Sequence, residues 1–427
     1  MQKRPAIILA AILILIPLSS SGQKQVNSPL ARFNLGLLEP IASYRSLGMG
    51  GAGTAMRDNL TINFVNPASY SSLDTNSFIF DFGIDYGLNF ISDETSSDLS
   101  DDLNFDHLTM GFPVSRRWGV AIGLIPLSNG YYNISESVLE GDPGYDPVTG
   151  EYTSFHKGGG GLSGFFIGTG LNISKNISAG ANMSVIFGSL RRSNEFDFND
   201  YFYTYQTSTT EKYSLAGIGL DLGLQYEASL KNDYFINIGL SYGLSKHLKS
   251  NFETLTYRFN LYSTADTLVY LADDSEKAFI PATLRTGIFI GKKNKWNAGL
   301  DYIYTKWSDA SLAGSDGYLT DVQSLLAGIE YTPDRFANYG FMRRIDYRAG
   351  VHFGGNYLSL EGNPVKEKGV SIGVGIPLRR TYSKVNFFAD YTQRSLDGGS
   401  IIHKEDYFTF GLSINMFDIW FLKQKYN

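Results

Sequence analysis

The 427-residue sequence contains no cysteine and comparatively few charged residues. Without cysteine the chain can form no disulfide, no thiolate zinc site, no cysteine nucleophile and no lipid anchor on a cysteine. Charged residues make up 18% of the chain, against an ordinary fraction of about 25%, and the formal net charge is −6. Because nucleic-acid-binding proteins are typically basic, we expect no nucleic acid among the partners.

Recognisable catalytic and metal-binding motifs are also missing. The five histidines are scattered, and none stands at metal-ligand spacing or beside a nucleophile motif. Ser163 follows a glycine run but lacks the G-x-S-x-G pattern, so a hydrolase built on one serine and one histidine is a minor alternative. The segment 48–53 matches G-x-G-x-x-G, but the flanking strand and helix of a dinucleotide site are absent. The sequence therefore predicts no enzyme, no catalytic residue, no metal site and no cofactor.

Only one long apolar run is present, and it lies at the N-terminus. Lys3 and Arg4 precede the apolar segment 6–18, and small residues follow it up to Gly22. The run is about 13 residues long, whereas a spanning helix needs about 20. This pattern predicts a secretory signal peptide over residues 1–22. The mature protein is then either soluble or a membrane β-barrel.

Glycine and aromatic residues are abundant, and both favour strands or turns over helices. There are 46 glycines, and aromatic residues make up 14% of the chain. Between Ile177 and Phe187 the apolar residues occupy alternate positions, which is the period of a strand with one apolar face. About fourteen segments follow this pattern: 76–91, 104–114, 118–126, 162–173, 177–189, 213–229, 234–247, 279–291, 295–307, 322–332, 346–353, 369–378, 385–394 and 407–415. The sequence predicts an all-β fold, a transmembrane antiparallel β-barrel of about 14 strands over residues 76–427.

The predicted connections alternate between tight, basic turns and long, acidic loops. The turns include 115–117, 174–176 and 292–294, and the loops include 128–161, 191–212 and 249–278. Outer-membrane barrels combine short periplasmic turns with long outer loops, and basic turns suit anionic head groups. We expect a Gram-negative outer-membrane protein with both termini in the periplasm. Turns are polar wherever they occur, so the charge pattern alone does not decide the location or the orientation of the protein.

Residues 23–75 precede the first predicted strand and do not alternate. They contain a small-residue stretch over residues 48–53 and then the tripeptide Asn66-Pro67-Ala68. On these motifs and the strand count, the chain resembles the FadL/TodX-like family of outer-membrane hydrophobic-compound transporters. The resemblance implies an N-terminal hatch in the lumen, over residues 23–75, and contacts with outer-membrane lipids. It marks as hatch-motif residues Gly48, Gly50, Gly51, Gly53, Asn66, Pro67 and Ala68.

The resemblance also implies a small hydrophobic ligand, fatty-acid-like or aromatic, that leaves sideways through a gap at a kinked third strand. Pro126 lies at the end of the predicted third strand, and proline cannot donate to the hydrogen-bond ladder of a sheet. Pro126 is therefore the candidate for a lateral gate. The simpler alternative is that Pro126 only ends the strand.

The C-terminal sequence leaves a second function open. Its ending, Trp420-Phe421-Leu422-Lys423-Gln424-Lys425-Tyr426, is similar to that of Bacteroidetes-type members of the same family. Some of these members serve type IX protein secretion. The alternative function is therefore a non-transporting accessory barrel, a shuttle or a plug, with a secretion translocon as its partner.

Several charged residues lie on the polar faces of the predicted strands. A charge that faces lipid at mid-bilayer costs several kcal/mol, so these side chains must face the lumen. They form either a structural network, with Arg45 and Arg57 of the hatch as partners, or a polar path or proton-coupled gate. The predicted lumen residues are Asp81, Asp85, Asp221, Asp301, Glu330, Arg348, His352 and Asp390.

Overall fold

The computed structural model describes residues 27–92, 97–198, 205–260, 263–274, 277–311, 319–379, 381–396 and 403–419. The predicted signal peptide, residues 1–22, and the chain end at 420–427 lie outside the described residues. The helices in the described part are short, and none is long and apolar enough to cross a membrane.

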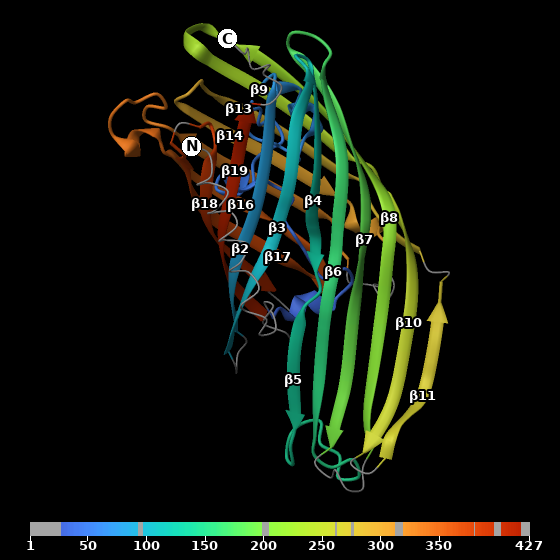
Figure 1. Ribbon diagram of the computed structural model, residues 1–427. Helices are drawn as coiled ribbons and strands as arrows, with labels where there is room; N and C mark the ends of the chain where they lie inside the picture. The colour runs from blue at the N-terminus through green and yellow to red at the C-terminus, as the bar shows by residue number, and fades with distance from the viewer. Residues whose placement is uncertain are drawn as a thin grey trace, which may run out of the picture.

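Fourteen antiparallel strands form a closed barrel (Figure 1). The last strand, β19 (His403–Ile419), pairs with the first wall strand, β2 (Ser77–Ser92), and this pairing closes the wall. Each of the fourteen segments predicted from the sequence overlaps one wall strand, so the predicted fold is confirmed. The other wall strands are β3 (Ser97–Ser115), β4 (Trp118–Asn129), β6 (Tyr152–Asn172), β7 (Ile177–Phe198), β8 (Gln206–Ser229), β9 (Tyr234–Gly243), β13 (Thr283–Lys292), β14 (Trp296–Thr305), β15 (Val322–Tyr331), β16 (Asp346–Leu360), β17 (Asn363–Pro377) and β18 (Lys384–Leu396).

The two faces of the wall differ as the alternation predicts. On β8, Leu220, Leu222 and Leu224 point outward with 38–47% of their surface exposed. Asp221 lies between them on the lumen side, where it faces Lys246. A wall that presents apolar side chains outward and polar or small ones inward is the pattern of a membrane β-barrel.

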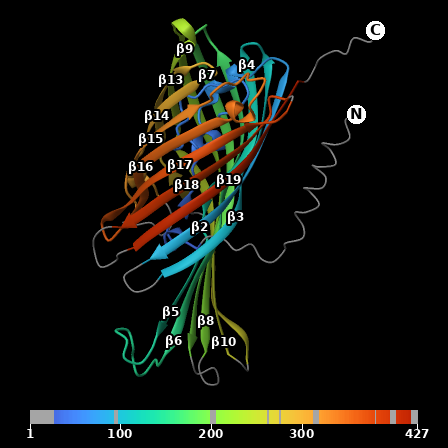
Figure 2. The ribbon, with the colours of Figure 1, turned by 90° about the vertical axis from the view of Figure 1, so that its left-hand side faces the viewer.

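The barrel has two unlike ends. At the short-turn end, wall strands join through brief connections such as 116–117, 173–176 and 293–295. At the long-hairpin end, several strands project past the barrel as an open sheet (Figures 1 and 2). This sheet contains the outer parts of β6, β7 and β8 together with β5 (Tyr132–Val138), β10 (Lys246–Asn260) and β11 (Ser263–Asp273); the short β12 (Lys277–Ile280) also pairs with β10.

The projecting sheet corrects the prediction of three loops at 128–161, 191–212 and 249–278. Strands β5, β10, β11 and β12 and the extensions of β7 and β8 occupy most of these segments. The segments are rich in Thr, Tyr, Phe and Val, which favour strands. Much of the sheet is exposed on both faces, so its sequence lacks the one-sided apolar alternation that marks a wall strand. The predicted strand 234–247 is likewise divided, because β9 ends at Gly243 and β10 begins at Lys246.

Residues 27–75, the described part of the hatch, lie in the lumen (blue in Figure 1). They contain η2 (Pro29–Arg32), β1 (Leu37–Leu38), α2 (Tyr44–Leu47) and η3 (Pro67–Ser72). Much of the segment is buried, and η3 contacts the wall strands β4, β6, β7 and β8. The hatch therefore fills the lumen mainly toward the short-turn end.

The described chain begins and ends at opposite ends of the barrel. Asn27 bonds to Ser100 and Asn133 at the long-hairpin end. Ile419 pairs with Ser77 at the short-turn end. The prediction placed both termini on one side. The termini themselves lie outside the described residues, but the first described residue is not on the side of the last.

Candidate functional site

The small-residue stretch brings the hatch backbone against the barrel wall. A Cβ on Gly48 would lie 3.2 Å from the Cα of Gly373, and a Cβ on Gly50 would lie 2.5 Å from the Val351 carbonyl oxygen. Gly50 has a φ of +70° and Gly51 one of +86°, a region where side chains are strained. Glycine is therefore required at Gly50 both for its conformation and for the close approach.

Backbone groups of the same stretch bind polar side chains of the wall. The Gly50 N–H donates to Ser371 Oγ at 2.8 Å. The N–H groups of Gly53 and Thr54 both donate to Asp301 Oδ2 at 2.7 Å. The predicted lumen residue Asp301 therefore holds the hatch backbone.

Asn66, Pro67 and Ala68 form the start of η3 and tie it to the wall. Asn66 Oδ1 accepts from the Ala68 N–H at 3.1 Å, which caps η3 at its N-terminus, and Pro67 is its first residue. Asn66 Nδ2 donates to the Thr54 carbonyl at 2.8 Å and lies 3.2 Å from the carbonyls of Leu224 and Leu240 on β8 and β9. Ala68 is fully buried. The tripeptide thus joins two parts of the hatch to two wall strands.

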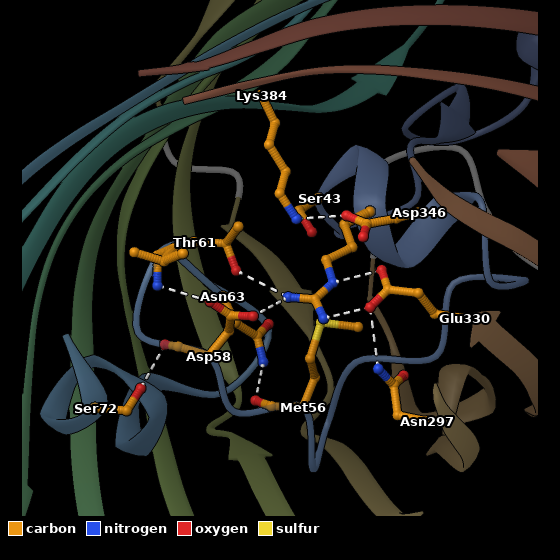
Figure 3. Close-up of polar contacts among 12 residues, drawn as sticks. Ser43, Met56, Asp58, Thr61, Asn63, Ser72, Asn297, Glu330, Asp346 and Lys384 are labelled. Atoms are coloured by element: carbon orange, nitrogen blue, oxygen red, sulfur yellow. Dashed lines mark hydrogen bonds and ion pairs between the residues drawn. The ribbon is translucent and has the colours of Figure 1, made fainter. Parts of the chain in front are cut away.

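A buried charge network anchors the hatch near the short-turn end (Figure 3). Arg45 donates to both carboxylate oxygens of Glu330, at 2.7 and 2.9 Å, and also pairs with Asp58 of the hatch. Glu330 accepts in addition from Arg348 Nε at 2.7 Å. Figure 3 shows the carboxylates of Asp58, from the hatch, and of Glu330, from β15, pointing toward the same guanidinium group, that of Arg45. The predicted residues Glu330 and Arg348 are therefore bridged to the hatch through Arg45.

The network continues to Asp346 on the wall, which pairs with Lys384 and lies 3.4 Å from Arg348 Nη2. Burial alone would raise the pKa of Asp58, but the Arg45 guanidinium holds that pKa below its usual range. Breaking a buried ion pair by removing one partner typically costs about 3–5 kcal/mol. The network therefore resists displacement of the hatch.

A second hatch arginine, Arg57, makes an independent attachment. Its Nε lies 2.9 Å from Glu227 Oε2 on β8. Its guanidinium also donates to Ser178 Oγ at 2.9 Å and to Asn172 Oδ1 at 2.8 Å. Arg45 and Arg57 thus bind separate arcs of the wall.

The remaining predicted lumen residues face inward but belong to separate local contacts. Asp221 lies 3.7 Å from Lys246 Nζ, and His352 lies 3.7 Å from Asp390. Asp81 Oδ1 lies 3.4 Å from His107 Nε2. The structure therefore gathers only part of the predicted set into one network.

Some of the lumen groups were not predicted. Asp58 lies in the non-alternating hatch, and Asp346 is the first residue of its strand, so neither stood out as a charge within an apolar alternation. Asp106 adjoins His107 in β3, at a shift in register opposite Gly83 and Ile84. Such a β-bulge re-aims a side chain. Two polar residues in succession inside an alternating strand were the available signal.

A cavity of about 400 Å³ lies between the hatch and the inner face of the wall. One part of its lining is apolar and includes Leu162, Ile186 and Trp307. Another part carries the carboxylates of Glu39, Asp85, Asp106, Glu367 and Asp390. Burial, reinforced by the charge of Asp106, raises the pKa of the hatch residue Glu39 to about 7.

The barrel wall has a window between β3 and β4. Pairing of these strands extends only to Leu108 and Leu124, and beyond this point β3 pairs only with β2. Strand β4 continues past Pro126 to Asn129, paired with β6 through a shift in register next to Pro126. The simpler alternative, that Pro126 ends the strand, is therefore wrong. A second cavity, of about 200 Å³, lies at this window and shares Glu39 with the lumen cavity.

Hatch residues border the window on two sides. Strand β1 takes up the free edge of β4, where Leu38 pairs with Ser128 and the Glu39 N–H donates to the Leu127 carbonyl at 3.0 Å. Toward the long-hairpin end, the Asn27 side chain exchanges two hydrogen bonds with the backbone of Asn133, at 2.8 and 2.9 Å. The Asn27 N–H also donates to Ser100 Oγ on β3 at 3.0 Å. The window is thus bounded by wall pairing at one end and by Asn27 at the other.

Comparison with known proteins gives a family and a fold. A family model described as BamG matches residues 1–427. No curated protein sequence matches the chain. Among solved structures, a Pseudomonas aeruginosa FadL homologue has a TM-score of 0.60 at 12% identity, with 90% of this chain and 100% of that chain covered. The Pseudomonas putida toluene transporter TodX has a TM-score of 0.58 at 15% identity, covering 90% and 99%. The CymD monoaromatic hydrocarbon channel has a TM-score of 0.57 at 15% identity, again covering 90% and 99%.

Proposed function

The chain belongs to the BamG family, and from the geometry of its lumen and the likeness of its fold to solved hydrophobic-compound channels we propose an outer-membrane channel for small hydrophobic molecules. The molecule enters the lumen cavity from the long-hairpin end and leaves sideways through the window between β3 and β4. The observation that carries this proposal is the adjacency of the two cavities, whose linings share Glu39, Asp85 and Asp106. The transported class is fatty-acid-like or aromatic.

The outward face of the wall supports a position in the outer membrane, with the short-turn end in the periplasm. Pro126 is eight residues from Trp118, where β4 begins. At about 3.3 Å per residue and a strand tilt of about 40°, this separation is about 20 Å along the barrel axis. An apolar band about 25 Å tall then includes the window, which opens toward lipid.

The anchored hatch favours lateral exit over passage straight through the barrel. A molecule that crossed to the short-turn end would have to displace the Arg45 and Arg57 attachments. A molecule that leaves through the window displaces neither attachment. The carboxylates beside it disfavour an ionised fatty acid, so the proposal is for a cargo that crosses in a neutral form.

Cross-linking the window tests the channel. Asn104 and Asn129 lie on opposite sides of the window and line the same small cavity. Because the chain has no cysteine, Asn104→Cys/Asn129→Cys can be joined specifically by a short bis-maleimide. The matched control is Ile372→Cys/Ala389→Cys, a pair on wall strands that are already hydrogen-bonded.

The assay is uptake of a hydrophobic aromatic tracer by outer-membrane vesicles that contain each variant. We expect cross-linking of the window pair to abolish protein-dependent uptake and cross-linking of the control pair to leave it unchanged. Full uptake with a closed window would reject lateral exit.

A second candidate function is that of a non-transporting accessory barrel of a secretion complex. The projecting sheet favours it, because β11 pairs only with β10 within the described residues. On β11, Leu268, Val269, Tyr270 and Leu271 are 41–64% exposed. An apolar strand with a free edge can add a strand of a partner. The accessory function predicts that a partner chain co-purifies with the parent protein and is lost from the variant Val269→Lys/Leu271→Lys. It also predicts that the parent protein shows no tracer uptake. These two results together would favour this function over the channel.

A further inference from the structure

A row of aromatic residues encircles part of the short-turn end on the outer face of the wall. Tyr234 on β9 stands opposite Lys292, which stands opposite Trp296; Trp296 stands opposite Tyr331, and Tyr331 opposite Tyr347. Their neighbours Asn297, Glu330 and Arg348 bond to one another in the lumen, so this row points outward. Aromatic rows of this kind lie where the hydrocarbon of a bilayer meets its head groups.

The connection 332–345 is much longer than the other described connections at this end, and it lies beside the aromatic row. The Tyr347 hydroxyl donates to the Met342 carbonyl at 3.1 Å, which brings η6 (Phe341–Arg344) to the outward-facing Tyr347. Phe336, Tyr339 and Met342 are 72%, 90% and 65% exposed. Large apolar side chains so exposed mark a contact surface.

The same surface is strongly basic. Lys295 Nζ donates to the Pro333 carbonyl at 2.7 Å, and Arg335 donates to Asn294 Oδ1 at 3.3 Å, so the turn 292–295 and the connection 332–345 form one unit. Within these two segments, six cations stand against one acid, Asp334. The cations are Lys292, Lys293, Lys295, Arg335, Arg343 and Arg344. We call these two segments the basic-aromatic rim.

We propose that the basic-aromatic rim is a binding site for the phosphate head groups of anionic phospholipids in the inner leaflet of the outer membrane. The arginine and lysine side chains contact the phosphates, and the exposed aromatic and methionine side chains enter the head-group layer beside the aromatic row. Charge complementarity and continuity with the lipid-facing row select a lipid over a protein as the occupant. The proposal rests on the membrane orientation given under the proposed function, but the site includes no residue of the transport path.

The rim lies across the barrel from the window. Counting around the wall, the junction of β14 and β15 is seven strands from the junction of β3 and β4 in a barrel of fourteen. Lipid bound at the rim therefore leaves the window facing other lipids. It holds the side of the barrel that has no role in lateral exit.

The test is a lipid titration of the full-length protein in detergent, followed by native mass spectrometry. The lipids are phosphatidylglycerol, phosphatidylethanolamine and lipid A. The variant is Arg343→Gln/Arg344→Gln. The matched control is Arg116→Gln/Arg117→Gln, an exposed arginine pair at another short turn of the same end, beside the outward Trp118.

We expect the parent protein to prefer phosphatidylglycerol to phosphatidylethanolamine. Each arginine near an anionic head group contributes about fivefold in affinity, so the rim variant loses about 25-fold for phosphatidylglycerol. The control variant keeps the parent affinity. A Phe341→Ser/Met342→Ser variant, which retains every charge, also weakens binding.

Four outcomes would overturn the proposal. They are an equal loss in the control variant, the absence of a preference for phosphatidylglycerol, a preference for lipid A, and a co-purifying protein that the rim variant releases. A preference for lipid A would also reverse the orientation. Tracer uptake through the window is measured separately, so failure of the lipid site does not decide the channel.

Discussion

Replacing Arg45 with methionine removes the centre of the buried network and keeps most of the side-chain volume. Arg45 is 12% exposed and pairs with Asp58 and Glu330, which are 14% and 7% exposed. Glu330 keeps Arg348 as a partner after the substitution, whereas Asp58 loses its ion-pair partner. We therefore expect Arg45→Met to destabilise the seated hatch by about 3–5 kcal/mol, mostly through Asp58.

The double variant Arg45→Met/Asp58→Asn tests that origin. Neutralising Asp58 removes the uncompensated charge, so the double variant regains a substantial part of the loss, and the two substitutions are strongly non-additive. The comparison is Arg258→Gln, whose ion pair with Asp266 is exposed and is worth about 1 kcal/mol or less.

Hydrogen exchange of hatch amides measures the effect without unfolding the barrel. The Gly53 N–H, which donates to Asp301, reports whether the hatch is seated. A loss of 3–5 kcal/mol corresponds to exchange faster by roughly two to four orders of magnitude, whereas amides of the wall strands keep their protection. A change below about 1 kcal/mol in Arg45→Met, or simple additivity with Asp58→Asn, would refute the view that this network anchors the hatch.

Three further predictions concern the hatch and the window. Gly50→Ala lowers the opening free energy of the hatch, measured by amide exchange, by about 2 kcal/mol or more, because its Cβ would lie 2.5 Å from a backbone carbonyl oxygen. Gly51→Ala, whose Cβ would meet only a leucine methyl at 3.4 Å, costs about 1 kcal/mol. Equal exchange rates in the two variants would contradict the close approach at Gly50. The raised pKa of Glu39 means that the folded protein binds a proton there more tightly than the unfolded chain. The pairing of β1 with β4 therefore becomes less stable as the pH rises from 4.5 to about 7, and Glu39→Gln removes this pH dependence. The same pH-corrected exchange rate of the residue-39 amide in the parent protein and in Glu39→Gln would count against this prediction. Asn27→Ala removes the two bonds to Asn133, and spin labels on β3 and β5 then report a broader distance distribution; an unchanged distribution would show that Asn27 does not hold the window.

The wall was predictable because lipid and lumen impose opposite demands on successive residues. This demand places Leu220 and Leu222 outward and Asp221 inward, and it is visible in the sequence as a period of two. No such demand acts on the projecting sheet, so the sequence predicts loops where β10 and β11 lie. Their Thr-rich, aromatic segments satisfy strand propensity without a buried face.

The hatch shows where sequence reasoning stops. Its glycines and the Asn66 tripeptide were recognisable as a motif, and Arg45 and Arg57 as available cations. Which wall residue each would meet depends on how a non-periodic segment folds across distant strands, as when Gly53 meets Asp301. The sequence offers Pro126 as the candidate lateral gate, whereas the borders of the window at Asn27 and β1 come from the hatch, far away in the sequence.

Native mass spectrometry of the full-length protein, gently extracted from its own outer membrane, tests the central claim most directly. One spectrum records both bound small molecules and co-purifying chains. The channel account predicts a lone barrel with a small hydrophobic molecule in the cavity of about 400 Å³, which cross-linking at Asn104→Cys/Asn129→Cys traps against washing. A stable complex with a large partner and no small molecule would contradict it and support the accessory function.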